Sequence, residues 1–264
     1  ISYKTEMLFM IKKLIPKKIF INIFKIISKF LTKVNGKYVE GFFVRSGDFK
    51  FLVEVKDMSV GRKLRTDGSY GREELERIFK LVSKESSIIF VGAHIGALAI
   101  PTAKRVKSCI FIEANPKTFQ FLNNNIDLNN ISNVKAYNIA VGERKGSINF
   151  VLNTVNSGGS KREPVIKQEM YYYDKPETIS IPLVTLDSIC DDQNEKYDLV
   201  FMDIEGSEIF ALKGMDSVLN RSKALIIEFI PHAITNVANS NVDEFVAYTS
   251  KYFSFCYVPS KGKY

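Results

Sequence analysis

Residues 87–96 read SIIFVGAHIG, and this stretch decides the fold. Its first five residues are mostly apolar and β-branched, which predicts a short buried strand over residues 87–91. Gly92 and Gly96 then allow a tight turn into a helical stretch at residues 95–106. A buried strand that passes through a glycine turn into a helix begins a strand–helix–strand unit, so the stretch predicts an α/β fold.

The same alternation continues downstream of this turn. Short apolar strands are predicted at residues 109–113, 134–139, 199–204 and 224–229, and helices at 116–129, 206–219 and 241–252. Strands that alternate with helices predict a mostly parallel, Rossmann-like sheet with helices on both faces. The long segment 143–197 between the third and fourth strands is expected to be functional, with residues 156–173 as a lid.

The chain is expected to consist of three successive regions. Residues 37–60 alternate like a β-hairpin with its turn at residues 46–48, and residues 71–83 have the pattern of an amphipathic helix. The expected regions are therefore a basic helical segment at 1–36, a hairpin lead-in at 37–70 and the α/β domain at 71–264.

Most of the net charge lies in the first of these regions. Residues 1–36 hold eight lysines and one glutamate, a net +7 of the total +8, so residues 37–264 carry only +1. A basic groove for nucleic acid is therefore not indicated. The three cysteines are far apart and form no CxxC pair, which favours a reducing, cytoplasmic location.

The basic segment is also amphipathic. Its longest uncharged run in the helical part is six residues, far short of the roughly 20 that a membrane span needs. Two interpretations remain open: a helix that packs on its own domain with its lysines in water, and a helix within residues 7–33 that makes a peripheral contact with an anionic membrane surface. The apolar residues at helical spacing are Ile19, Phe20, Ile23, Phe24, Ile26, Ile27, Phe30 and Leu31.

A first candidate site follows the first two strands. Gly92, Ala93, His94 and Gly96 form a turn where a ligand can approach the backbone, at a helix N-terminus with free N–H groups. Glu113 ends the next strand, where a carboxylate can accept both hydroxyls of a ribose. Packing of the helix would explain the glycines alone almost as well, and Glu113 favours a nucleotide-type site.

A second candidate site follows the fourth strand, where residues 203–208 read DIEGSE. Asp203 and Glu205 are candidates for acid–base chemistry or for a divalent ion, and alternatively for capping the helix that follows. Glu228, in an apolar strand, is expected to face the same cleft because an unpaired buried carboxylate is unfavourable. His232 is a candidate general base, with a plain surface histidine as the alternative.

Together these motifs resemble the FkbM family of S-adenosylmethionine-dependent methyltransferases over residues 70–235. The segments that carry the resemblance include FVGAHIG (90–96), FIEANP (111–116), NNNIDLNNISNV (123–134), AVGERKG (140–146), TLD (185–187), DLVFMDIEGSE (198–208), LKG (212–214) and IIEF (226–229). The resemblance implies a class I methyltransferase fold and S-adenosylmethionine as cofactor. It would place Gly92, Ala93, His94 and Gly96 near the methionine part, Glu113 and Ala114 at the ribose, Asn138 and Ala140 at the adenine, and Asp203 and Glu205 beside the transferred methyl.

The reaction that the resemblance implies is O-methylation of a hydroxyl on a sugar, a glycan, a glycolipid or a natural product, with no nucleic acid as partner. Asp203, Glu205 or His232 would accept the hydroxyl proton, directly or through water. A metal-assisted version, with Mg²⁺ among Asp203, Glu205 and Glu228, is the alternative; the main expectation includes no metal.

The chain departs from the family pattern at three positions. Phe90 stands where the family has an acidic residue, His94 where it has Asn, and Phe201 where a Lys is common. The family fold also ends in a seventh strand, whereas here a sixth strand predicted at residues 253–258 is followed by little sequence. Two interpretations remain open: a domain truncated at its C-terminus, or a sheet whose edge is finished differently. A degenerate, non-catalytic cofactor-binding or membrane-associated scaffold protein is the alternative function.

Overall fold

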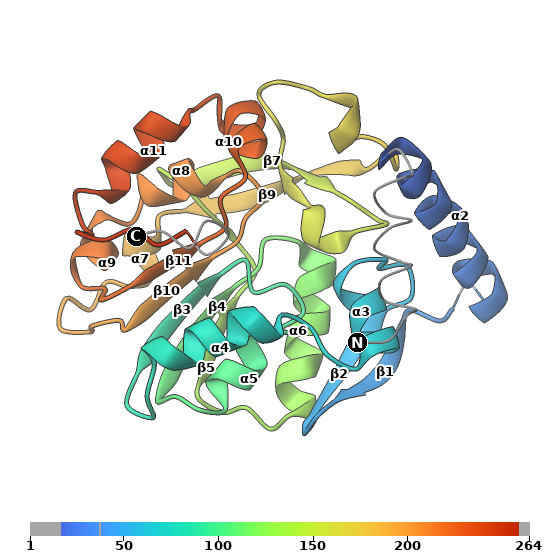
Figure 1. Cartoon of the computed structure of the whole chain (residues 1–264), viewed down its shortest axis with the longest axis horizontal. Coiled ribbons are helices and arrows are strands. Elements are labelled where there is room, and N and C mark those ends of the chain that lie inside the picture. The colour runs from blue at the N-terminus through green and yellow to red at the C-terminus, as the bar shows by residue number, and fades with distance from the viewer. Residues whose placement is uncertain (1–16, 37, 259–264) are drawn as a thin grey trace.

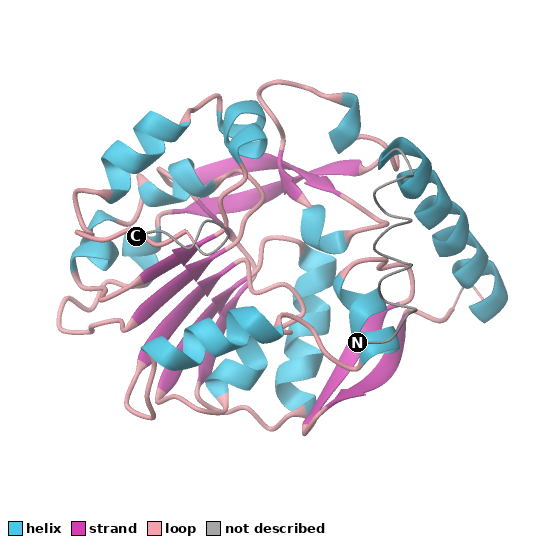
Figure 2. Ribbon diagram, in the orientation of Figure 1, coloured by secondary structure: helices cyan, strands magenta, loops and turns pink. Residues whose placement is uncertain are grey.

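The computed structural model describes residues 17–36 and 38–258 of the 264-residue chain, apart from the side chains of residues 17–21 and 24. The part of the predicted membrane contact that falls on residues 7–16 lies outside these residues. A central sheet with helices on both faces occupies one side of the molecule, and a smaller sheet and a hairpin flank it (Figures 1 and 2).

The central sheet has five strands, all parallel, in the order β11-β10-β3-β4-β5. The strands are β3 (Ser87–Val91), β4 (Ser108–Ile112), β5 (Val134–Tyr137), β10 (Leu199–Met202) and β11 (Leu225–Ile227). Their residues are almost all apolar because both faces of the sheet are covered. The first strand lies beside the fourth, so the strand order reverses between β3 and β10. In sheets of this kind ligands bind at that reversal, outside the carboxyl ends of the strands.

Helices cover the two faces of this sheet and form two cores. On one face the core contains Phe90, Phe111 and Phe201 together with residues of α4 (Arg72–Leu81), α5 (Ala99–Ala103) and α6 (Pro116–Leu128). On the other it contains Val91, Ile110 and Met202 together with residues of α7 (Leu186–Ile189), α8 (Glu208–Leu212), α9 (Asp216–Asn220), α10 (Pro231–Ala238) and α11 (Val242–Thr249). The predicted fold class, a mostly parallel Rossmann-like sheet between helices, is confirmed.

The long segment after β5 builds a second sheet. Its strands β6 (Ala140–Val141), β7 (Gly146–Leu152), β8 (Lys161–Arg162) and β9 (Glu177–Val184) lie in the order β6-β9-β7-β8, and β7 pairs with β9 in antiparallel fashion. Residues 153–176 connect β7 to β9, and their larger part, loop 153–174, includes β8 and the short 3-10 turns Ser157–Gly159 and Glu169–Tyr171. Asp174 closes this loop on itself, because its carboxylate accepts hydrogen bonds from the backbone N–H groups of Thr154 and Val155.

The region before the central sheet contains helix α2 (Lys17–Asn35), the hairpin β1–β2 (Gly41–Ser46 and Phe49–Glu54) and α3 (Val60–Asp67). The predicted hairpin is confirmed, with Gly47 in a left-handed conformation (φ +57°) at its turn. The hairpin is attached to α6 by Asn125, whose side chain exchanges two hydrogen bonds with the backbone of Leu52.

Several predicted boundaries are wrong. The helix predicted at 206–219 is broken into α8 and α9, and Gly214 lies between them, where a Cβ atom would come within 2.0 Å of the carbonyl oxygen of Gly142. The helix predicted at 95–106 is only α5, since Pro101 is tolerated only in a first turn. Helices α3 and α10 were not predicted, and the described residues 253–258 form none of the named strands.

Candidate functional site

A cavity of about 260 Å³ lies at the reversal of strand order, outside the carboxyl ends of β3, β4 and β10. The turn after β3 and the end of β10 form its two sides at the reversal, and loop 153–174 adds Asn156, Ser157, Gly158 and Ser160. The lining includes these predicted site residues: Gly92, Ala93, His94, Glu113, Ala114, Ala140, Asp203 and Glu205. Two distant parts of the sequence, after the first and the fourth strands, are thus brought into one site.

Gly92 makes this close approach possible. Its φ is +88°, and a Cβ atom there would lie 1.9 Å from the carbonyl oxygen of Asp203. Only a glycine fits this combination of left-handed backbone and contact. His94, two residues on, is also left-handed at φ +52° and turns its backbone N–H toward Glu113.

Glu113 lies at the end of β4 with its side chain almost fully buried. One carboxylate oxygen accepts the backbone N–H of His94 at 2.9 Å and the other accepts that of Asn115 at 2.8 Å. Burial raises the pKa of Glu113 to about 7, because removal from water disfavours the charged form. A carboxylate oxygen can accept two hydrogen bonds, so each still has one lone pair for a ligand donor.

Three carboxylates gather on the opposite side of the cavity. One oxygen from each of Asp203, Glu205 and Glu228 lies within 4.8 Å of the others. Burial, followed by the charge of Glu228, raises the pKa of Asp203 well above its usual range, and the two side chains are hydrogen-bonded to each other. Carboxylates this close hold a proton between them in preference to two negative charges.

Glu205 has a different partner. Its carboxylate lies 3.3 Å from the ammonium group of Lys161, which is buried at 6% exposure. Lys161 belongs to β8, in the loop that closes over the cavity, so this ion pair connects the loop to the end of β10. A buried ammonium needs such a partner because its desolvation is otherwise unfavourable.

Neither Asp203 nor Glu205 caps the following helix, because the N-cap residue of α8 is Ser207 and its side chain makes no capping hydrogen bond. Glu208 accepts hydrogen bonds from the backbone N–H groups of Ile204 and Gly206 with one carboxylate oxygen. Asp203 and Glu205 are therefore free of that structural task and face the cavity.

Among the residues that the structure describes, Gly96, Asn138 and His232 are predicted site residues that do not line the cavity. A side chain at Gly96 would collide with Ile100, so Gly96 serves helix packing. Asn138 donates to the backbone carbonyls of Glu113 and Ala114 and thereby positions them. His232 begins α10 with an exposed side chain, and its Nδ1 lies 3.5 Å from the hydroxyl of Tyr171.

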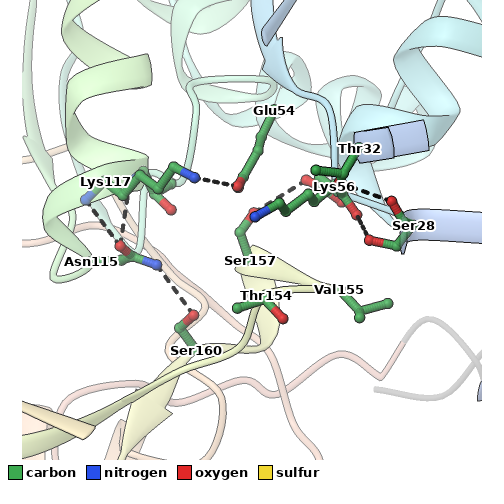
Figure 3. Close-up of polar contacts among 12 residues, drawn as sticks. Ser28, Thr32, Glu54, Lys56, Asn115, Lys117, Thr154, Val155, Ser157 and Ser160 are labelled. Carbon is green, nitrogen blue, oxygen red and sulfur yellow. Dashed lines mark hydrogen bonds and ion pairs between the residues drawn. The ribbon is translucent and has the colours of Figure 1, made fainter. Parts of the chain in front are cut away.

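Sequence reasoning missed a chain of polar residues at the rim. His94 Nε2 lies 2.8 Å from Ser157 Oγ, which in turn donates to the carboxylate of Asp57 at 3.2 Å. Asn115 likewise reaches the loop, donating to Ser160 Oγ (Figure 3). The polar run at 156–160 signalled a functional loop, but neither Lys161 nor Asp57 carried a motif.

The cavity also holds polar atoms without partners. Five buried side-chain nitrogen and oxygen atoms in the described part of the chain make no hydrogen bond. Three of them belong to lining residues, namely His94 Nδ1, Asn156 Oδ1 and Ser207 Oγ. Buried polar atoms are rarely left unpaired, so this cluster indicates a place for a polar ligand.

The apolar residues at positions 90 and 201 face each other. Phe90 and Phe201 are directly paired in the register of β3 and β10, with ring centroids 5.3 Å apart, and Phe111 meets Phe90 edge-on. Both line the deep end of the cavity. The acidic residue and the lysine that the family resemblance leads one to expect at these two positions would also face each other.

A doubly wound parallel sheet with a polar cavity at its reversal point defines a Rossmann-like ligand-binding domain. Residues 91–251, more than half of the chain, match the family model of the methyltransferase FkbM domain. The chain therefore belongs to the FkbM methyltransferase family, and the resemblance drawn from its motifs is confirmed.

Individual relatives are more distant. A tRNA (guanine(37)-N(1))-methyltransferase of Plasmodium knowlesi is 26% identical over 98 residues, which cover 36% of this chain and 14% of that protein. A methyltransferase FkbM from Methylobacillus flagellatus is similar at 23% identity and a TM-score of 0.43, covering 65% of this chain and 38% of that one. Trm5b from Pyrococcus abyssi is similar at 22% identity and a TM-score of 0.32, covering 41% of this chain and 33% of that one. The chain thus spans well under half the length of each of these proteins.

Proposed function

We propose that this chain binds S-adenosylmethionine in the cavity and methylates a hydroxyl oxygen of a small-molecule or glycan acceptor. The observation that carries the proposal is the pairing, across one cavity, of a buried Glu113 with the carboxylates of Asp203, Glu205 and Glu228. Glu113 can accept hydrogen bonds from the hydroxyls of a ribose. The three carboxylates can stabilise a cationic reacting centre and accept the proton that leaves the acceptor.

The residues present fit this cofactor. Glu113 has two lone pairs left for the two ribose hydroxyls, and Ala114 and Ala140 offer small apolar surfaces beside it. The unpartnered atoms of His94 and Ser207 can be satisfied by the polar groups of the ligand. When bound, the cofactor supplies a methyl group already activated on a positively charged sulfur.

The protein then has to align the acceptor and remove its proton. As the oxygen–methyl bond forms and the sulfur–methyl bond breaks, the hydroxyl proton needs a base. We assign this role to the pair Asp203 and Glu228, whose raised pKa values bring a carboxylate base closer to neutral pH. Lys161 holds Glu205 to one side in an ion pair, so Asp203 takes the proton.

The scheme needs no metal ion. Three carboxylates could hold a divalent cation, but here Glu205 is neutralised by Lys161 and Asp203 is hydrogen-bonded to Glu228. Both arrangements balance the negative charge that would otherwise call for Mg²⁺. We therefore expect activity to persist after exhaustive chelation.

The exchange of residues at positions 90 and 201 supports an active site over a degenerate one. Had only one charged residue been lost, the other would remain buried and unpaired, which strongly destabilises a protein. Instead Phe90 and Phe201 fill the space together, and Glu113, Asp203 and Glu205 keep their positions around the cavity.

We propose that the methyl acceptor is not a nucleic acid. Residues 37–264 carry a net charge of only +1, whereas binding of nucleic acid relies on many cationic contacts to phosphates. In an activity assay, methyl transfer to tRNA in place of sugar or small-molecule hydroxyls would overturn this part of the proposal.

The first test is calorimetric titration with S-adenosylmethionine and S-adenosylhomocysteine. We expect both to bind, and Glu113→Gln to weaken binding about 10- to 100-fold through lost charged hydrogen bonds. Glu73→Gln is the matched control, because Glu73 is 79% exposed on α4, away from the cavity lining. Absence of binding at millimolar cofactor would overturn the proposal in favour of a non-catalytic scaffold, and equal binding by Glu113→Gln would remove Glu113 from the site.

A further inference from the structure

Helix α2 turns an apolar stripe away from the protein. Within residues 22–35 the apolar side chains recur three or four positions apart, which places them on one face of the helix. Their exposed fractions are 39% for Ile23, 67% for Ile26, 37% for Ile27, 62% for Phe30 and 64% for Val34. This orientation is the reverse of the packing of an ordinary amphipathic helix, in which the apolar face covers the core.

The polar side of α2 is what contacts the rest of the chain. Ser28 is 5% exposed, and its hydroxyl donates a hydrogen bond to the backbone carbonyl of Lys56 at 3.3 Å (Figure 3). The ammonium group of Lys25 lies 5.6 Å from the centre of the Tyr173 ring, a cation–π distance. These two contacts fix the helix in the orientation that leaves the stripe outside.

The charge of α2 selects what can cover the stripe. The sequence of the helix, KKIFINIFKIISKFLTKVN, contains five lysines and no acidic residue. Lys29 and Lys33 are exposed beside the stripe. A second copy of α2 would bring lysines against lysines, whereas an anionic lipid surface offers both a hydrocarbon boundary and negative headgroups.

The length and charge of the helix also define how it would meet a bilayer. None of the helices in the described residues is long and apolar enough to cross a membrane. A helix with a narrow apolar stripe bordered by lysines lies in the plane of the interface, with the stripe among the acyl chains and the lysines at the phosphates.

We propose that α2 docks this protein on the surface of an anionic lipid bilayer through Ile23, Ile26, Ile27, Phe30 and Val34. The side of α2 that holds Ser28 and Lys25 stays on the body of the protein. Lys56 adjoins Asp57, which accepts a hydrogen bond from the cavity-lining Ser157, and Tyr173 belongs to loop 153–174, so α2 is attached to the segments that support one side of the cavity.

The test is sedimentation of the full chain with phosphatidylcholine vesicles that contain 0 or about 30% phosphatidylserine. We expect binding to the anionic vesicles, little binding to the neutral ones, and weaker binding as salt increases. The double variant Ile26→Ser/Phe30→Ser should bind anionic vesicles at least tenfold more weakly. Lys29→Gln/Lys33→Gln should lose most of the preference for anionic over neutral lipid.

The matched control is Val242→Ser/Val246→Ser. These residues have the same spacing on α11 and are also exposed, at 43% and 52%, so the control should bind vesicles like the unmodified chain. Because the stripe is exposed, both serine pairs should leave the unfolding temperature nearly unchanged. Undiminished vesicle binding by Ile26→Ser/Phe30→Ser would overturn the proposal, and so would a stripe-dependent dimer that ignores vesicles.

Discussion

Glu113 allows a quantitative prediction about stability and pH. Its pKa is about 7 in the folded chain, against an ordinary value of 4.5, and burial is the largest cause. Between these values the folded state binds the proton more tightly than the unfolded state, so the protein must lose stability as pH rises from 4.5 through 7. Worked between pH 5 and pH 8, this one carboxyl lowers the free energy of unfolding by roughly 2–3 kcal/mol.

The assay is urea unfolding of the cofactor-free protein at pH 5 and pH 8. Glu113→Gln does not titrate, so its free energy of unfolding should fall by roughly 2–3 kcal/mol less over that interval than that of the unmodified chain. The comparison is independent of how well Gln replaces the two hydrogen bonds of Glu113, because that difference is present at both pH values. Glu208, whose pKa burial also raises to about 7, should behave alike in Glu208→Gln. Parallel pH curves for Glu113→Gln and the unmodified chain would refute the reasoning.

Two further substitutions test the core of the site. Phe90→Asp should destabilise the chain by about 3–5 kcal/mol, since it removes a buried ring and places a carboxylate between Phe111 and Phe201. Thermal unfolding measures this loss, and an unchanged unfolding temperature would contradict the packing described. Asp203→Asn should lower methyl transfer by about 10²- to 10⁴-fold while calorimetry shows cofactor binding within a fewfold of the unmodified chain. Turnover that survives this change would remove Asp203 as the proton acceptor.

The strands of the central sheet were predictable because each is buried on both faces. Such strands appear in a sequence as short continuous apolar runs, and β3 begins and ends at the predicted residues. Helices were less predictable because their ends depend on contacts with distant residues. The break between α8 and α9 contains Gly214, whose backbone packs closely against the carbonyl of Gly142, more than 70 residues earlier, and no local pattern encodes that proximity.

In the candidate site, too, some residues could be predicted from the sequence and others could not. Residues at the ends of strands, such as Gly92, Glu113 and Asp203, could be placed from sequence because parallel strands bring their carboxyl ends to one edge. Lys161 could not, since it reaches Glu205 across 44 residues of sequence from a two-residue strand in a loop. His232 illustrates the opposite case: its residue type suits a general base, and in the structure its side chain is exposed in α10 and lies outside the cavity lining among the described residues.

Helix α2 shows that an amphipathic pattern alone does not predict which face of a helix packs on the protein. The spacing of apolar residues determines that a helix has an apolar face, but the partner that the folded body offers determines where that face points. The groups that contact α2 are the carbonyl of Lys56, which accepts a hydrogen bond from the hydroxyl of Ser28, and the ring of Tyr173, which lies near the ammonium group of Lys25. The polar side of α2 therefore binds inward, and within residues 17–36 and 38–258 the apolar side is left exposed. A basic helix held in this way is prepared for an anionic lipid surface before any lipid is bound.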